Sequence, residues 1–219
     1  PVMIKATSGG GGRGIRRCDS EEELRSQDPR VISEATKAFG SAEVLLEKCI
    51  INPKHIEVQV LGDSHGNAVH LYERDCSIQR RNQKLIEIAP SPQISEEQRQ
   101  YLGQLAVTAA RSVGYASAGT VEFLLSGEDI YFMEMNTRIQ VEHTITEQIT
   151  GVDIVREQIR VAEGRQLSYR QEDISYRGYA IQMRINAEDP KNDFLPSFGR
   201  ITHYYAPGGP GVRVDTAIY

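Results

Sequence analysis

The sequence predicts an α+β fold, with a small αβ unit at the amino-terminal end and a larger, mostly antiparallel sheet with flanking helices. Strand-like runs are frequent, and short turns join several of them, as in antiparallel hairpins. Strand and helix patterns do not alternate regularly, which disfavours a parallel α/β sheet. Hydrophobic residues make up 39% of the 219 residues, which is enough for a substantial core.

The amino-terminal unit is expected over residues 1–50. It begins with an apolar strand over 2–5 that ends in a lysine, and a glycine-rich loop follows over 8–14. A second strand is expected over 43–47, and the Asn52-Pro53 pair marks the break before the larger unit. The chain begins without an initiator methionine, inside an apolar run, and ends as abruptly, so we expect both units to be truncated.

An interrupted helix is expected between these two strands. Ser20 and Glu23 have the spacing of a capping box, which predicts a helix start. Pro29 lacks a backbone donor and predicts a break. A second helix is therefore expected over 30–39, ended by Gly40.

The larger unit, residues 51–219, is expected to open with a hairpin. Residues 55–60 alternate between apolar and polar types, 63–67 supply turn residues, and 68–72 form the returning strand. This pattern is typical of a strand with one buried face.

Two helices and two more strands are expected further along the larger unit. Ser95 and Gln98 form a second capping box, and a shorter helix is expected over 154–162. The residues expected to form the apolar stripe of the first helix are Leu102, Leu105, Ala106, Ala109 and Val113. Strands are expected over 178–186 and 199–205.

The composition excludes several function classes. The net charge is −5 and no basic stripe is present, so nucleic acid is not an expected partner. No apolar run reaches membrane-spanning length, so no membrane association is expected. Cys18, Cys49 and Cys76 are too few and too far apart for a disulfide framework, and Cys76 is expected to be a buried structural residue. A reducing compartment is expected: the cytoplasm, or the mitochondrial matrix or a plastid in a eukaryote.

The most informative segment is a predicted hairpin that carries acidic residues. Residues 120–125 and a run that contains Glu134 are expected to be strands, with a turn over 126–129. If the loop holds an odd number of residues, Glu122 lies opposite Glu134 and shares a face with Asn136, because strand side chains alternate. Opposed carboxylates repel each other, and a hard cation such as Mg²⁺ or Mn²⁺ removes that conflict. An even loop separates the acids and leaves a solvated surface hairpin.

Arg138 and Glu142 follow in the same run. If the strand continues to His143, both share the face of Glu134, and an anion site could adjoin the metal. A carboxylate held near cations can accept a proton, so Glu142 is a candidate base. A salt bridge at the strand end is the structural alternative. His143 is expected to be structural, because no second histidine lies at metal-ligand spacing.

Two further segments have both a functional and a structural interpretation. The backbone amides of the glycine loop can surround a phosphate, and Lys5 lies next to it, although no Walker ending is present. The alternative is a plain surface loop. Residues 77–84 are rich in donors, with candidate contacts to an anion or a ribose at Gln79, Asn82 and Lys84. A solvated strand is the alternative there, and Arg184 is either a salt-bridge residue or an oxyanion stabiliser.

Taken together, these segments resemble the biotin carboxylase family of the ATP-grasp superfamily. They keep the order of the family over nearly the whole chain, and the run around Arg138 is the most specific. The matching segments are Ile4–Ala6 with the glycine loop, Glu47–Lys48, Asn52–His55, Glu73–Arg81, Glu134–His143, Arg184–Pro190 and Ala206–Gly209.

The resemblance implies a set of nucleotide and metal contacts. ATP would lie between the small lid and the larger sheet. Phosphates would contact Lys5, Gly9, Gly10, Gly11 and Gly12. The remaining nucleotide contacts would come from Glu47, Lys48, Cys49, Ile50, His55, Gln79 and Asn82. One or two Mg²⁺ or Mn²⁺ ions would be held by Glu122, Glu134 and Asn136.

The resemblance also implies a reaction: ATP and bicarbonate would form carboxyphosphate, and carrier-bound biotin would be carboxylated. Bicarbonate or biotin would contact Lys84, Arg138, Gln140, Val141 and Arg184. Glu142 would be the base, and Arg184 would stabilise the biotin enolate. The implied partners are a biotin carboxyl carrier and a carboxyltransferase, as subunits or fused domains, and a second copy in a homodimer. The acceptor stays open among acetyl-CoA, as in fatty acid biosynthesis, propionyl-CoA, another acyl-CoA, pyruvate and urea.

Asn82 departs from the family pattern, because many members have histidine there. Asparagine can hydrogen-bond a ribose or a phosphate but cannot titrate, so a different nucleotide affinity is expected. Two alternative functions stay open: a carbamoyl-phosphate or purine-pathway ligase that uses bicarbonate without biotin, and a non-catalytic scaffold that binds nucleotide or a partner subunit.

Overall fold

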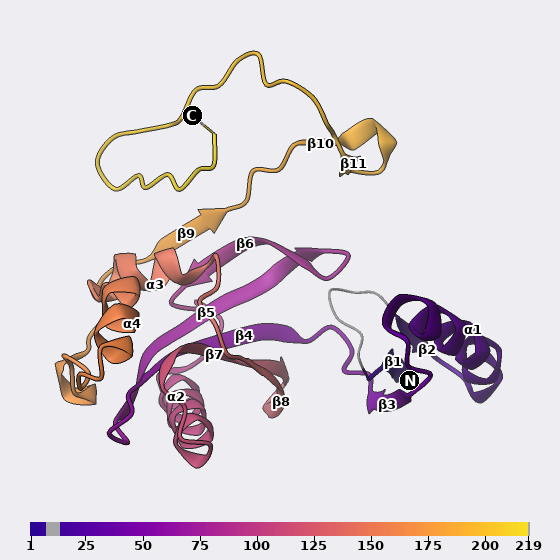
Figure 1. Ribbon diagram of the computed structural model, residues 1–219, viewed down its shortest axis with the longest axis horizontal. Helices are drawn as coiled ribbons and strands as arrows, with labels where there is room; N and C mark the ends of the chain where they lie inside the picture. The colour runs from indigo at the N-terminus through magenta and orange to yellow at the C-terminus, as the bar shows by residue number, and fades with distance from the viewer. Residues whose placement is uncertain (8–13, 219) are drawn as a thin grey trace. The chain divides into compact units, whose positions relative to one another are not determined.

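The computed structural model describes residues 1–7 and 14–218, which divide into two compact units, Pro1–Arg184 and Ile185–Tyr219. Figure 1 colours the chain from its amino-terminal to its carboxy-terminal end. The predicted division after residue 50 falls in the connection between strands β3 and β4 and stays a prediction. None of the described helices is both long and apolar enough to span a membrane.

The first part of the Pro1–Arg184 unit is a three-stranded antiparallel sheet with one helix. Its strands, in the order β2-β1-β3, are Ile15–Cys18, Val2–Ala6 and Val44–Lys48. Helix α1 (Glu21–Phe39) packs on β1 and β2, and Ile4, Cys18 and Val31 form the core between them. The predicted αβ arrangement is therefore confirmed for the described residues.

Helix α1 is continuous, so the predicted break at Pro29 is wrong. A proline in a helix interior costs about 3 kcal/mol, because it removes a backbone hydrogen bond and its ring meets the carbonyl of the preceding turn. Burial of Val31 and Ala35 and the caps at both ends oppose that cost. The start is as predicted at Ser20, whose side chain accepts a hydrogen bond from the Glu23 amide.

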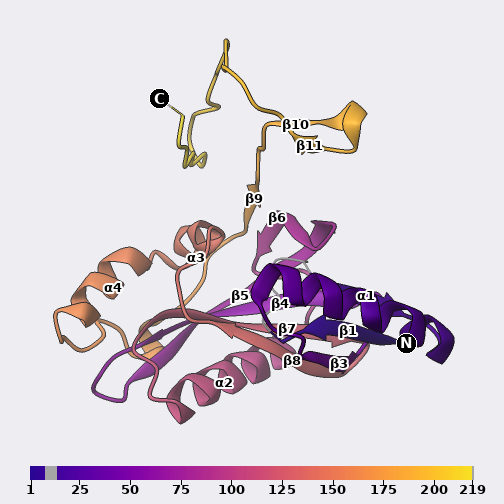
Figure 2. The ribbon, with the colours of Figure 1, turned by 45° about the vertical axis from the view of Figure 1, so that its right-hand side comes forward.

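The second part of this unit is a six-stranded antiparallel sheet in the order β8-β7-β4-β5-β6-β9 (Figures 1 and 2). Its strands are β4 (Lys54–Gly62), β5 (Ala68–Arg80), β6 (Gln83–Ala89), β7 (Ser117–Ser126), β8 (Asp129–Asn136) and β9 (Ala180–Met183). Strand β5 is longer than predicted, because it continues through residues 77–80. There it forms a second hairpin with the start of β6. Arg81 and Asn82 make its two-residue turn, both at positive φ, a conformation that asparagine tolerates better than most residues.

The central strands present different chemistry on their two faces. Helix α2 covers the apolar face in a core made with Ile56, Val58, Val60, Val121, Phe123 and Leu125. The alternate residues His55, Glu57 and Gln59 of β4, and Thr120 and Glu122 of β7, therefore lie on the opposite face. In Figure 2, α2 lies on one side of the sheet and α3 on the other.

The two helices predicted for residues 51–219 lie where the sequence predicted them, but the buried face of α2 differs in part from the predicted apolar stripe. Helix α2 (Glu96–Ser112) has the predicted capping box, and α4 covers Ile154–Ala162 as predicted. The buried stripe of α2 includes Gly103, Val107 and Ala110, whereas Val113 is exposed. Gly103 is required because the His70 ring lies only 2.5 Å from the position of a Cβ there.

The hairpin of β7 and β8 brings the acids together by an unexpected route. Ser126 pairs with Asp129, so the turn holds two residues, which is the even loop that was expected to separate the acids. The register shifts between Phe123 and Glu122, which makes Met133 the extra residue of a β-bulge. The bulge restores the opposition that an even loop would have removed, so Glu122 does face Glu134, as predicted.

Strand β8 ends at Asn136, and residues 137–142 form a loop before helix α3 (His143–Thr150). The prediction that the strand continues to His143 is therefore wrong. Arg138 and Glu142 owe their positions to the loop and the start of α3 rather than to strand parity.

The second unit is largely irregular. It contains β10 (Glu188–Asp189), β11 (Leu195–Pro196) and a short 3-10 helix η2 (Pro190–Asn192), while η1 (Gln171–Asp173) belongs to the first unit. The strand predicted over 199–205 is absent from the described residues of this unit. A strand needs a hydrogen-bonded neighbour, and the alternating pattern there has no pairing partner in this part of the chain.

Candidate functional site

Two opposed carboxylates and an amide form the first part of the site. Glu122 is buried on β7, and Glu134 is exposed opposite it on β8. Asn136 Nδ2 donates to Glu122 Oε1 at 2.9 Å and to Glu134 Oε1 at 3.3 Å. The three predicted metal ligands are therefore neighbours, with one oxygen of each acid at the Asn136 amide nitrogen and with Asn136 Oδ1 accepting from Arg138.

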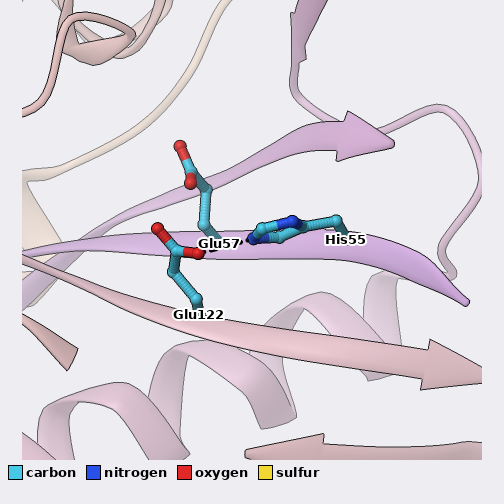
Figure 3. A group of neighbouring side chains, drawn as sticks. All are labelled: His55, Glu57 and Glu122. Carbon is cyan, nitrogen blue, oxygen red and sulfur yellow. Dashed lines mark hydrogen bonds and ion pairs between the residues drawn. The ribbon is translucent and has the colours of Figure 1, made fainter. Parts of the chain in front are cut away.

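His55 lies beside this group. Its Nε2 is 2.7 Å from Glu122 Oε2, and its Nδ1 is 2.8 Å from Gln79 Nε2. Figure 3 shows His55 and Glu57 from β4 and Glu122 from β7, with their polar ends gathered together. Burial favours the neutral form of Glu122, but the His55 hydrogen bond and the charge of Lys84 outweigh it and lower the pKa of Glu122 to about 2.

Lys84 is the central cation of the site. Its Nζ donates to Glu142 Oε1 at 2.7 Å, to Glu122 Oε1 at 3.0 Å, and to Glu57. Burial opposes the charged form, yet the carboxylates, led by Glu57, raise the pKa of Lys84. The lysine therefore stays protonated and balances three buried acids.

A fully buried arginine, Arg74, contacts these groups from the protein interior. Arg74 Nε donates to Glu57 Oε1 at 2.6 Å, and its Nη1 donates to Gln59 and to Thr146 of α3. Burial disfavours ionised Glu57, but the charges of Arg74 and Lys84 lower its pKa. The same guanidinium contacts Gln140, so it links the central strand to the loop of residues 137–142.

Arg184 and Glu142 form the other side of the site. Arg184 Nη2 donates to Glu142 Oε2 at 2.8 Å, and Nε donates to Glu87 Oε1 at 2.7 Å. Burial raises the pKa of Glu87, although Arg184 opposes that shift. A proton acceptor, two cations and a buried acid thus lie within one connected network.

The residues of the loop 137–142 differ in burial. Gln140 is buried and donates to Glu122 Oε1 at 2.8 Å, whereas Val141 is exposed. Arg138 is exposed and donates to the Ile139 carbonyl and Asn136 Oδ1. A strand-end salt bridge between Arg138 and Glu142 is not among the ion pairs of the described residues, because Glu142 pairs with Lys84 and Arg184. His143 Nδ1 contacts the Gln140 carbonyl.

The predicted nucleotide residues of the amino-terminal unit are placed only in part. Lys5 Nζ lies 3.7 Å from Glu47 on the neighbouring strand, and Lys48 contacts the Tyr131 hydroxyl. Cys49 and Ile50 follow β3 directly, and Cys49 is free. Gly9, Gly10, Gly11 and Gly12 lie outside the described residues. Cys76 is buried and free, as predicted, and burial raises the pKa of its thiol.

Three buried charged residues were missing from the sequence prediction: Glu57, Arg74 and Glu87. The alternation of β4 carried a usable signal for Glu57, because it lies two residues after His55 and must share its face. Arg74 and Glu87 carried none, since a charged residue in a strand is usually exposed.

The comparison with known families agrees with this geometry. The family described as "Carbamoyl-phosphate synthase L chain, ATP binding domain" matches residues 1–170, and the "Biotin carboxylase C-terminal domain" matches residues 182–219. The chain belongs to the biotin carboxylase family. Its fold is the ATP-grasp fold of that family, which confirms the prediction.

Two curated members of the family illustrate the similarity. The 2-oxoglutarate carboxylase small subunit of Hydrogenobacter thermophilus is 62% identical over 99% of this chain and 46% of the relative. The biotin carboxylase of a Nostoc species is 57% identical over 100% of the chain and 49% of the relative. The chain therefore spans about half the length of these relatives.

Two solved structures of the family are also similar. The biotin carboxylase domain dimer of the Hydrogenobacter thermophilus 2-oxoglutarate carboxylase, in complex with MgADP, ADP and bicarbonate, has a TM-score of 0.93 at 62% identity and covers 97% of this chain and 47% of its own. The Campylobacter jejuni biotin carboxylase in complex with β,γ-ATP has a TM-score of 0.93 at 51% identity, over 97% of this chain and 48% of its own.

Proposed function

We propose that the protein containing this chain carboxylates carrier-bound biotin with ATP and bicarbonate, through carboxyphosphate. The observation that carries the proposal is the network in which Lys84, Glu142 and Arg184 join the acids Glu122 and Glu134 on one face of the sheet. Phosphoryl transfer depends mainly on positioning and on charge neutralisation. A face with acids for a cation and cations for anions fits that requirement.

Glu122, Glu134 and Asn136 fit a hard divalent cation. All three offer oxygen ligands, and Asn136 bridges the Oε1 atoms of both acids, which brings them to one place. When bound, Mg²⁺ or Mn²⁺ would supply positive charge beside the phosphate oxygens of the nucleotide. The phosphates and the adenine of ATP would contact the predicted lid residues. His55, Gln79 and Asn82 would contact the nucleotide from the larger sheet.

Bicarbonate would bind at Lys84, Arg138, Gln140 and Val141. Its oxygen would attack the γ-phosphorus of ATP, ADP would leave, and the resulting carboxyphosphate would break down to CO₂ and phosphate. Glu142 lies within hydrogen-bond distance of Lys84 and Arg184, and it would take the bicarbonate proton. The released phosphate would take the N–H proton of biotin, and Arg184 would stabilise the negative oxygen that forms as the biotin nitrogen attacks CO₂.

The relatives support a multi-component assembly, because their names include a carboxylase small subunit and a pyruvate carboxylase subunit, and one solved structure is a dimer. We propose a biotin carboxyl carrier and a carboxyltransferase as partners, and a homodimer. The free cysteines support a reducing compartment such as the cytoplasm.

One observation favours a second candidate. The family that matches residues 1–170 is named for carbamoyl-phosphate synthase. Such a ligase would cleave ATP with bicarbonate but without response to biotin.

The experiment is bicarbonate-dependent ADP release by the full-length protein, with and without free biotin. We expect biotin to stimulate turnover, and Arg138→Ala to lower it about 100-fold or more, as for loss of an oxyanion contact. Arg170→Ala is the matched control, because its side chain is 83% exposed and lies outside the network. Turnover that ignores biotin would favour the second candidate, and absence of turnover would favour a scaffold.

A further inference from the structure

Glu87 is a buried acid in this network that has no role in the proposed reaction. It lies on β6, is fully buried, and pairs in register with Gln182 of β9. Its Oε1 accepts the hydrogen bond from Arg184 Nε, while its Oε2 is buried without a hydrogen-bond partner among the described residues. An ionised group with one unsatisfied oxygen costs free energy in a sheet.

Strand pairing alone does not require an acid at this position. The neighbours Ile86 and Ile88 pair with Met183 and Ile181 of β9 through the backbone register. An apolar residue would continue that pairing without a buried charge. The distinctive contact of Glu87 is its ion pair with Arg184.

Two acids hold Arg184 by two different nitrogens. Glu87 contacts Nε and Glu142 contacts Nη2, and the Arg184 amide donates to the Leu85 carbonyl at 3.0 Å. Nη1 makes no hydrogen bond to the described part of the chain, and the side chain is 26% exposed. The guanidinium is therefore held at two of its nitrogens, Nε and Nη2.

The two holders differ during turnover. Glu142 would accept a proton from bicarbonate, and a neutral carboxylic acid is a weaker acceptor than a carboxylate. Glu87 makes no contact with Lys84, whose acids are Glu57, Glu122 and Glu142. It can therefore keep its contact with Arg184 when Glu142 becomes neutral.

We propose that Glu87 is a positioning residue, which holds the Nε edge of Arg184 throughout turnover so that Nη1 stays directed at the reacting oxygen of biotin. This inference rests on the proposed function. Loss of Glu87 removes the hold at the step in which biotin reacts and leaves ATP cleavage with bicarbonate intact.

The test compares Glu87→Ala with Glu73→Ala in the full-length protein. Glu73 is an equally buried acid that accepts a hydrogen bond from Arg99 Nε at 3.0 Å, outside the network. Three quantities are measured: ADP release without biotin, kcat and KM for free biotin, and the thermal midpoint. A charge-assisted hydrogen bond corresponds to about 10-fold to 100-fold in rate.

For Glu87→Ala we expect the biotin-stimulated kcat to fall about 10-fold or more, with biotin-free ADP release within about twofold of the unaltered protein. Glu73→Ala should lower the thermal midpoint without changing biotin stimulation. Glu87→Gln keeps an acceptor without the charge, so a smaller loss is expected, and this variant carries the test alone if Glu87→Ala does not fold.

Two results would overturn the inference. One is an equal effect of Glu87→Ala and Glu73→Ala on biotin stimulation. The other is unaltered biotin kinetics in Glu87→Gln when it must serve alone. If the unaltered protein shows no biotin stimulation at all, the proposed function itself is wrong, which distinguishes that failure from failure of the positioning role.

Discussion

The low pKa of Glu122 predicts a specific dependence of stability on pH. The ordinary value is 4.5 and the folded value is about 2. Because the folded pKa is depressed, the stabilisation is present above pH 4.5 and is lost as the pH falls toward 2. At about 1.4 kcal/mol per pH unit, this difference corresponds to about 3 kcal/mol of unfolding free energy.

Urea unfolding of the unaltered protein and of Glu122→Gln, at several values between pH 7 and pH 3, measures this effect. The amide cannot titrate, so the stability gap between the two proteins should narrow by about 2–3 kcal/mol as the solution is acidified. Lys84→Met tests the cause, because removing that cation should reduce the pH dependence carried by Glu122. A gap of constant size from pH 7 to pH 3 would refute the reasoning.

Two further predictions concern backbone geometry. Deletion of Met133 makes the ladder regular and leaves Glu134 opposite Glu122, so we expect the Mg²⁺ concentration for half-maximal ADP release to change less than about twofold; insertion of one alanine after Met133 moves Glu134 out of register with Glu122, and we expect that concentration to rise about 10-fold. A Cβ at Gly103 would meet the His70 ring at 2.5 Å; Gly103→Ala should therefore lower the unfolding free energy by about 1–3 kcal/mol, and an unchanged urea midpoint would contradict the contact.

The parts of the fold that followed from the sequence have strong local signals. The capping box at Ser95 placed the start of α2, and the apolar period together with Gly164 placed α4. The continuous α1 was not predictable, because its tolerance of Pro29 depends on tertiary burial of Val31 and Ala35. The irregular segment at 199–205 shows the converse, since strand pattern without a partner gives no strand.

The site residues likewise divide into those with a local sequence signal and those that depend on tertiary contacts. Alternation placed Glu122 opposite Glu134 only for an odd loop; the loop is even, and the bulge that aligns the two acids has no local sequence signal that separates it from a simple hairpin. Lys84 and Arg184 were candidates from their segments alone, and family likeness added their specific roles. The contacts of Arg74 and Glu87 arise from strands far apart in the sequence, so local patterns could not identify them.

Lys84 is surrounded by carboxylates before any substrate arrives. An incoming anion meets a cation that already has three internal counter-ions, so binding is an exchange of one negative neighbour for another. The binding free energy is then the small difference between the attraction of Lys84 to the incoming anion and its attraction to the carboxylate that the anion replaces. We therefore expect the anion to bind weakly and to dissociate rapidly. Bicarbonate saturation should accordingly require concentrations far above those that a bare, preorganised ammonium pocket would need.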